Sequence, residues 1–145
     1  MMTHEDPRVQ RVIDFFHAYS PASVADFGRY YTEDCHFKDP FNEVRGLAEV
    51  QRIFRHMDEA LREPRFTVTA AVAQKDQCFL TWDFSFRLRR YRHAPQVVRG
   101  ASHLRFAPDG RIAVHRDYWD AAEELYEKLP VLGGLMRWLK RRAMA

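Results

Sequence analysis

The stretch YYTEDCHFKDPF, residues 30–41, marks a change in the character of the sequence. We predict that a helix ends within it, that residues 33–34 form a tight turn, and that a short strand follows. Proline cannot donate to a strand ladder, so this strand is expected to stop at Pro40. The stretch therefore predicts the junction between a helical segment and a sheet.

Asp39 is the candidate functional residue of this stretch. Side chains alternate along a strand, so Phe37 and Asp39 share one face, and His36 and Lys38 share the other. If Phe37 points inward, the Asp39 carboxylate lies beside apolar walls, where loss of water raises a carboxyl pKa and suits the group to proton transfer. The structural alternative is that Asp39 fixes the turn at Pro40, as aspartate before proline often does. The residues alone leave both interpretations open.

The periodicity of the remaining sequence predicts an α+β domain. Apolar residues at helical spacing predict three helices, and clean alternation predicts an antiparallel sheet with one apolar face. Helices followed by long strands favour a curved sheet folded over the helices. The helices are expected at residues 6–19, 23–31 and 47–61, with a loop at 42–46, and the strands at 66–72, 81–88, 98–106 and 111–119.

The composition is typical of a single folded domain. The chain has 145 residues, of which 46% are hydrophobic and 14% aromatic, enough for a core and for the walls of a pocket. Two cysteines, Cys35 and Cys78, together with the lack of a signal peptide or a membrane span, predict a reduced, soluble, cytoplasmic protein. No His/Cys cluster has the spacing of metal ligands, so we expect no metal site.

Positive charge is concentrated near the C-terminus. The net charge is +3, and four basic residues near the C-terminus, Arg137, Lys140, Arg141 and Arg142, carry +4, so the rest of the chain sums to −1. A near-neutral body is not typical of a nucleic-acid-binding protein, and we expect no nucleic-acid partner. We divide the chain into a domain at residues 1–120 and a C-terminal helical extension of the same domain at 121–145.

The extension is predicted to hold a short helix to Lys128, a break at 130–134 and a last helix. In the last helix, apolar residues lie beside the four basic residues, an amphipathic pattern that suits a membrane surface or a partner. Such segments more often dock on their own domain. We therefore expect docking, and membrane contact is the less favoured alternative.

Two motifs resemble those of the nuclear transport factor 2-like superfamily. They are Tyr-x-x-Asp-x-x-x-x-Asp-Pro-Phe at 31–41 and Phe-x-x-Asp-Gly-Arg-Ile at 106–112, followed by Tyr118-Trp119. Within the superfamily, the chain resembles the ketosteroid isomerase-like and SnoaL-like polyketide cyclase branch. The resemblance implies a cone, in which a strongly bent antiparallel or mixed sheet wraps around three helices and leaves an apolar pocket at the open end. It also implies a homodimer, a small hydrophobic ligand and no cofactor.

The resemblance to steroid isomerases is incomplete. In those enzymes the aspartate that matches Asp39 is the base that moves a proton next to a carbonyl. Their oxyanion is held by a tyrosine and a protonated aspartate, but this sequence has Phe15 and Ser102 at those positions. A supporting tyrosine is replaced by Phe54, whereas Tyr31 matches the other one. Losing one oxyanion donor costs about 10²–10³ in rate, which argues against ketosteroid isomerisation.

The cyclase branch places its acid/base aspartate on the last strand, where this sequence has Asp117. His115, Asp117 and Trp119 alternate along that strand and share the face that the resemblance turns into the pocket. Asp117 would orient and charge-stabilise His115, a residue type that titrates near neutral pH. Alternatively, Asp117 pairs with Arg116 or Arg105 at the rim, or His115 is a core histidine whose hydrogen bonds are satisfied.

These residues support two hypotheses from different classes. In the first, an isomerase or cyclase, with lyase and hydrolase variants, uses Asp39 or the His115/Asp117 pair to move a proton on a hydrophobic carbonyl compound, with Ser102 or a water as donor to the oxygen. In the second, the fold is a non-catalytic ligand-binding or dimerisation module, because fold does not fix function. The expected pocket is lined by Phe15, Tyr19, Tyr31, Phe37, Phe54, Trp82, Phe84, Ser102, Leu104 and Trp119.

Overall fold

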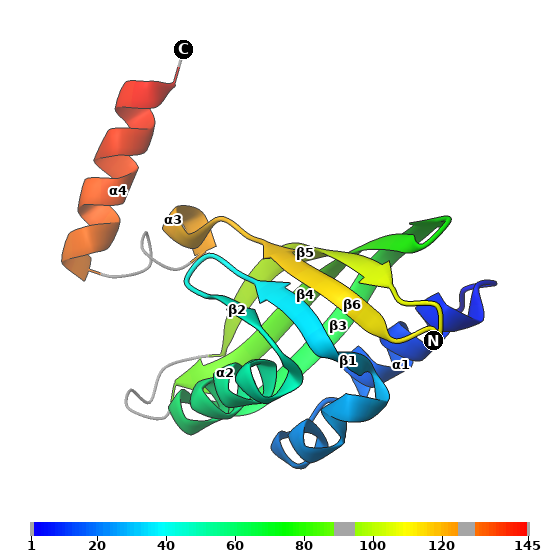
Figure 1. Ribbon diagram of the computed structural model, residues 1–145. Coiled ribbons are helices and arrows are strands. Elements are labelled where there is room, and N and C mark those ends of the chain that lie inside the picture. Colours follow the sequence, from blue (N-terminus) through cyan, green and yellow to red (C-terminus); the bar gives the residue numbers. More distant parts are fainter. Residues whose placement is uncertain (1, 89–94, 125–129, 145) are drawn as a thin grey trace.

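The computed structural model describes residues 2–88, 95–124 and 130–144. Figure 1 shows one curved sheet, helices beside it, and a further helix beyond it. In chain order the elements are α1 (Pro7–His17), the 3₁₀ helix η1 (Pro21–Arg29), β1 (Tyr31–Lys38), β2 (Glu43–Arg45), α2 (Leu47–Ala60), β3 (Leu61–Gln74), β4 (Gln77–Leu88), β5 (Gln96–Phe106), β6 (Ile112–Tyr118), α3 (Ala121–Glu124) and α4 (Pro130–Ala143).

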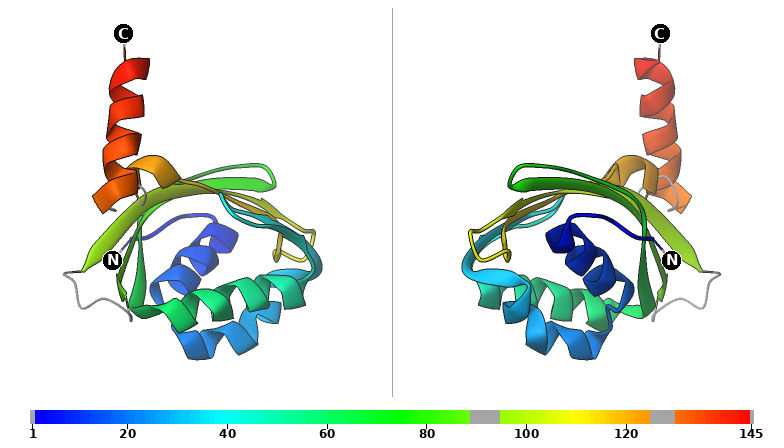
Figure 2. Two further views of the ribbon diagram at one scale, coloured as in Figure 1. Left: turned by 90° about the vertical axis from the view of Figure 1, so that its left-hand side faces the viewer. Right: turned by 90° about the vertical axis from the view of Figure 1, so that its right-hand side faces the viewer.

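The strands form one mixed sheet in the order β2-β1-β6-β5-β4-β3. β1 and β6 run parallel, and the other neighbouring pairs are antiparallel. Because sheets twist, the strands curve around the helices, and Figure 2 shows α1, η1 and α2 on the concave face. The predicted α+β cone, with a bent sheet and three N-terminal helical segments, is confirmed.

Local signals explain where α1 begins and which face it buries. Pro7 occupies the first helical turn, where its missing N–H costs nothing, and Asp6 caps the helix by accepting a hydrogen bond from the Arg8 backbone N–H at 2.9 Å. Apolar residues at spacings of three and four form a stripe that packs toward β3. The buried residues of this helix are Val9, Val12, Ile13, Phe15 and Phe16.

The alternation predicted for the long strands is clear in β4. Its even-numbered residues from Cys78 to Phe86, including Trp82 and Phe84, are buried on the concave side. Phe79 lies on the convex side, where its ring stacks on His103 of β5 with the centroids 4.2 Å apart. The concave face is therefore apolar and supplies the walls of a cavity between the sheet and the helices.

The N-terminal junction differs from the prediction in three places. Residues 33–34 form no turn, because β1 already begins at Tyr31 and an irregularity in its register with β6 accommodates the polar residues. The segment 42–46, predicted as a loop, contains β2, which pairs with β1. The second helix is a 3₁₀ helix that begins after Ser20 and ends at Arg29, whereas the predicted helix runs over residues 23–31.

The C-terminal extension also differs from the prediction. α3 ends at Glu124, and the rest of the predicted helix to Lys128 lies outside the described residues. α4 begins at Pro130 and continues through Gly134, so the predicted break at 130–134 is wrong. Proline is tolerated at the first position of a helix, and each interior glycine costs only about 1 kcal/mol relative to alanine.

α4 does not pack on the sheet, although the sequence favours docking. Figures 1 and 2 show it pointing away from the sheet, beyond α3. Its Leu135, Trp138 and Leu139 side chains are about half exposed, at 49%, 49% and 47%. Within the described ranges, no helix is both long enough and apolar enough to span a membrane.

Candidate functional site

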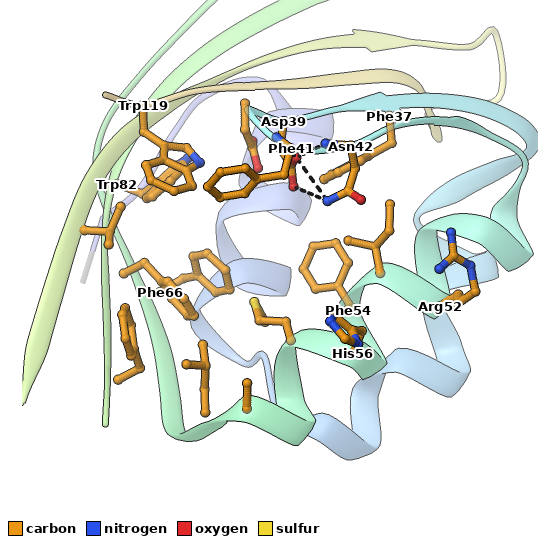
Figure 3. A pocket seen from close by; sticks show the side chains of 18 of the residues that line it. Phe37, Asp39, Phe41, Asn42, Arg52, Phe54, His56, Phe66, Trp82 and Trp119 are labelled. Atoms are coloured by element: carbon orange, nitrogen blue, oxygen red, sulfur yellow. Dashed lines mark hydrogen bonds between the residues drawn. The ribbon is translucent and has the colours of Figure 1, made fainter. Parts of the chain in front are cut away.

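A cavity of about 350 Å³ lies between α2 and the concave face of the sheet, a volume typical of small-molecule sites. Figure 3 shows Phe54 of α2 on one side, Phe66 and Trp82 of the sheet on another, and Phe41 and Trp119 near the β1–β2 turn. Its walls are mainly aromatic and aliphatic. The polar side chains that line it are Asp39, Asn42, Arg52, His56 and Asp117.

Two carboxylates, those of Asp39 and Asp117, line this one cavity. The parallel pairing of β1 with β6 aligns Lys38 with Arg116, and the two aspartates come next along their strands. Adjacent strands lie about 4.8 Å apart, so the pairing brings together two acids that are distant in sequence. The described ranges contain no group of three or more His, Cys, Asp or Glu side chains arranged to hold a metal ion.

Asp39 is held by the turn between β1 and β2. Its Oδ1 accepts hydrogen bonds from the backbone N–H groups of Phe41 at 2.8 Å and Asn42 at 2.6 Å. The side-chain amide of Asn42 also donates to Oδ1 and Oδ2, at 3.2 and 3.3 Å, as the dashed lines in Figure 3 show. Asp39 therefore fixes the turn, which is the structural alternative raised by the sequence, and at the same time lines the cavity.

Asp117 is held by a chain of buried side chains, which we call the Asp117 network: Tyr31, Trp82, Ser102 and His115. Its Oδ1 lies 2.5 Å from Ser102 Oγ and 2.5 Å from His115 Nε2. Behind these, the Trp82 indole N–H donates to Ser102 Oγ at 2.9 Å, and the Tyr31 hydroxyl lies 2.7 Å from His115 Nδ1. Side chains from β1, β4, β5 and β6 thus position one carboxylate.

The hydrogens of the Asp117 network have one consistent arrangement. The Trp82 N–H only donates, so Ser102 accepts from it and gives its own hydrogen to Asp117. Burial, and then the charge of Asp117, raise the pKa of the Tyr31 phenol well above its usual range, so Tyr31 keeps its hydrogen and donates it to His115 Nδ1. His115 therefore carries its hydrogen on Nε2, facing Asp117. Among the described residues, Asp117 Oδ2 has no hydrogen-bond partner.

The sequence profile of the SnoaL-like domain matches residues 12–115. The chain belongs to the SnoaL-like family. Solved structures superpose on most of its length, among them a putative SnoaL-like polyketide cyclase from Jannaschia sp. CCS1, with a TM-score of 0.71 and 12% identity over 84% of this chain and 94% of that one. The structure of TsrD from Streptomyces laurentii gives a TM-score of 0.71 and 18% identity over 90% of this chain and 98% of that one.

A third similar structure is a hypothetical protein with a ketosteroid isomerase-like fold from Catenulispora acidiphila, in complex with trimethylamine. Its TM-score is 0.70, with 16% identity over 84% of this chain and 92% of that one. At such identities the likeness shows the fold alone. A comparison with curated proteins found no match. The superfamily and branch predicted from the two sequence motifs are confirmed.

The cavity of this SnoaL-like domain contains part of the predicted site. The predicted residues that line it are Phe37, Asp39, Phe54, Trp82, Phe84, Asp117 and Trp119. His115, a predicted proton-transfer group, is only 1% exposed, lies behind Asp117 in contact with its carboxylate, and does not line the cavity. Of the alternative partners for Asp117, Arg116 lies over the Tyr118 ring and Arg105 pairs with Asp76.

Five residues predicted to line the pocket are instead buried in the core: Phe15, Tyr19, Tyr31, Ser102 and Leu104. Aromatic packing closes the narrow end of the cone, as Phe15 shows by packing against Phe27 with the ring centroids 5.3 Å apart. The Tyr19 hydroxyl donates to Asp58 of α2 at 2.8 Å. Ser102 is 1% exposed and gives its hydrogen to Asp117.

The prediction missed Phe41 and Asn42, which follow Asp39 and line the cavity. Phe41 is 55% exposed, and its ring centroid lies 5.5 Å from that of Trp119. The signal in the sequence was the turn itself: an aspartate that accepts from the next two or three backbone N–H groups folds them back toward its strand. Phe66, also missed, follows from the alternation of β3, whose inward face continues the wall formed by β4.

Gly100 gives the Trp82 indole the space it needs. The two residues are cross-strand neighbours, and a Cβ on Gly100 would lie 2.4 Å from Trp82 Cη2. Gly100→Ala is therefore expected to cost about 1–3 kcal/mol and to move the indole away from Ser102. Urea unfolding and near-UV circular dichroism measure the two effects. Ser102→Ala, which removes the hydrogen bond without the clash, is the control; a wild-type near-UV spectrum for Gly100→Ala would contradict the prediction.

Proposed function

We propose that this SnoaL-like domain is a cofactor-independent acid/base enzyme, of isomerase or cyclase type, that moves a proton on a small hydrophobic carbonyl compound. The observation that carries the proposal is the setting of Asp117, whose Oδ1 is held by two contacts of 2.5 Å at the wall of an apolar cavity. These bonds leave Oδ2 for a ligand. A carboxylate fixed in this way is suited to removing a proton from a carbon next to a carbonyl.

In the proposed reaction, Asp117 Oδ2 takes a proton from the carbon next to the carbonyl. The electron pair of the broken C–H bond forms the C=C bond of an enolate, and the negative charge moves to the oxygen. In an isomerisation, the carboxyl group returns the proton to a different carbon. In a cyclisation, the enolate carbon attacks a second carbonyl of the same ligand, whose oxygen takes the proton. Neither route needs an oxidant or a reductant.

The enolate oxygen needs a hydrogen-bond donor, and we assign this role to Asn42. Ser102 already donates its only hydroxyl hydrogen to Asp117, whereas the Asn42 amide lines the cavity and carries two hydrogens. Its contacts with Asp39, at 3.2 and 3.3 Å, are long for hydrogen bonds, so a ligand oxygen can compete for this donor. A single amide suits a substrate whose enolate is stabilised internally, by a second carbonyl or an aromatic ring.

One observation favours a second candidate, a non-catalytic binding module. Phe15 and Phe54 stand at the positions where steroid isomerases carry two tyrosines, so this chain has apolar rings there in place of hydroxyl groups. In that case the Asp117 network only satisfies buried polar groups, as any core must. The cavity and its ligand class are the same for both candidates, and only the chemistry separates them.

Deuterium exchange distinguishes an enzyme from a binder. A thermal-shift screen of hydrophobic ketones and 1,3-diketones first identifies a ligand, because a ligand at a hundred times its Kd stabilises the folded protein by about 2.7 kcal/mol. The ligand is then incubated with the protein in deuterated water, and NMR follows uptake at the carbon next to the carbonyl. Uptake far above the buffer rate supports the enzyme. Binding with uptake at the buffer rate supports the non-catalytic module.

A further inference from the structure

The C-terminal helix α4 takes no part in the cavity or in the Asp117 network. It points away from the sheet in Figures 1 and 2, and its sequence contains no acidic residue. Leu135, Trp138 and Leu139, which we call the apolar triplet, are each about half exposed. Large apolar side chains gathered at the surface in this way mark an interaction site.

The two sides of α4 have opposite chemistry. The apolar triplet is spaced by three and then one residue, so its members share one side of the helix. Arg137, Lys140 and Arg141, which we call the cationic triplet, repeat this spacing two positions later. Two residues turn an α-helix by about 200°, because one turn takes 3.6 residues. The cationic triplet therefore lies on the side opposite the apolar triplet.

We propose that α4 binds the surface of an anionic lipid bilayer and lies in the membrane plane. The apolar triplet enters the boundary between headgroups and acyl chains, and the cationic triplet faces the lipid phosphates. Tryptophan and leucine on one face, with lysine and arginine on the other, are typical of interfacial helices. Arg142 lies on the apolar side, at the C-terminal end of α4, with its guanidinium 5.5 Å from the Trp138 ring centroid, and its side chain is long enough to reach a headgroup from there. This inference does not depend on the proposed reaction.

The charge pattern favours a lipid surface over a protein groove. A protein groove needs acidic groups placed to match each cation, whereas an anionic leaflet presents negative charge along the whole helix and attracts each Lys or Arg near it. The four basic residues of α4 stand together after an almost neutral body, so the attraction acts on this helix rather than on the whole molecule.

Binding through α4 also keeps the cavity close to the bilayer. Trp119 lines the cavity and α4 begins at Pro130, so the ten residues between them span at most about 35 Å. Phe41, 55% exposed, lies beside Trp119 at the same wall. A hydrophobic compound dissolved in the membrane thus has a short path to the cavity.

Flotation with lipid vesicles tests the proposal on the full chain. One set of vesicles is pure phosphatidylcholine, and the other contains about one third phosphatidylserine. We expect the wild-type protein to float with the anionic vesicles, to stay in solution with the neutral ones, and to be released as the salt concentration rises, because surface attraction is screened by salt. A protein that floats with neither set overturns the proposal.

Matched variants distinguish binding through α4 from non-specific attraction by any positive charge on the protein. Changing the cationic triplet to glutamate is expected to weaken binding by at least about 100-fold, at about 1 kcal/mol per basic residue. Changing the apolar triplet to serine should abolish binding while leaving the melting temperature unchanged, because these side chains do not pack on the sheet. The control reverses three exposed charges of the body by the same amount, with Arg55→Glu, Arg62→Glu and Arg65→Glu.

The alternatives give different results. If the control and the cationic variant lose vesicle binding equally, the protein is attracted to the vesicles by its overall charge, which overturns the proposal. If vesicle binding is absent and the serine variant changes the oligomeric state in sedimentation, the apolar triplet covers a second copy of the chain. If the serine variant melts at a lower temperature, the triplet docks on its own domain. Both outcomes also overturn the proposal.

Discussion

The Asp117→Asn variant is expected to exchange the protons of a bound ketone about 10²–10⁴-fold more slowly than the wild-type protein, because an amide cannot take up the proton. Asparagine has the shape of aspartate, and its side-chain oxygen still accepts from Ser102 and His115. Ligand affinity and folding should therefore change little. NMR deuterium uptake gives the rate, and titration of the same ligand gives the affinity, so the two effects are measured on one compound.

Asp39→Asn is the matched control for this prediction. Asp39 lines the same cavity, but its Oδ1 is held by the Phe41 and Asn42 backbone N–H groups, and the amide oxygen of asparagine can accept the same two bonds. We expect the turn to persist and the exchange rate to stay close to that of the wild type. The opposite pattern, with a slow Asp39→Asn and a normal Asp117→Asn, would assign the base to Asp39. Normal rates in both variants would remove both assignments.

The alternation of apolar and polar residues along the strands is the feature of this sequence that best predicts the fold. In β4, the predicted inward face of Trp82 and Phe84 is the face that lines the cavity, because an apolar strand face has no other place to be buried. The start of β1 could not be predicted in the same way. Tyr31 pairs with Ile112 and its hydroxyl bonds to His115, both on a strand that is distant in sequence, so its place in the sheet depends on a tertiary neighbour.

The candidate site was predictable only within one strand. His115 and Asp117 are two residues apart, so sharing a face follows from the period of a strand alone. The remaining members of the Asp117 network depend on register: Ser102 faces Asp117 only because β5 and β6 pair as they do. The role of each side chain in the network also depends on its hydrogen-bond partners. Without the Tyr31 bond, His115 could be interpreted as the proton carrier, whereas in the structure it supports Asp117 from a fully buried position.

Raising the pH above about 9 is expected to destabilise the folded chain steeply, because four buried acids keep their protons in the folded state. Burial, and then the charge of Asp34, raise the pKa of the Cys35 thiol above the usual 9.0. Burial raises the pKa of the Cys78 thiol from 9.0 to about 11. Burial also raises the pKa of Tyr31, and burial followed by the hydrogen bond to Asp58 raises the pKa of Tyr19, both from the usual 10.0. Above these ordinary values the unfolded chain releases protons that the folded chain retains.

Proton linkage gives the direction and the size of this change in stability. Where the unfolded state binds fewer protons, the free energy of unfolding falls as pH rises, by up to about 1.4 kcal/mol per pH unit for each group. The contribution of Cys78 is complete below pH 9 and is lost by about pH 11, roughly 2–3 kcal/mol, and each tyrosine adds its own loss above pH 10. By pH 11 the total is about 5 kcal/mol, comparable with the whole stability of a typical domain.

Urea unfolding at pH 8, 9, 10 and 11, under reducing conditions, measures this loss directly. Cys78→Ala should reduce the fall between pH 9 and 11 and leave the contributions of Cys35 and of the two tyrosines. Val68→Ala, a buried change without a titrating group, should lower stability equally at every pH. A wild-type curve that stays level from pH 8 to 11 would mean that the two thiols and the two phenols ionise without unfolding, and that these side chains are open to water.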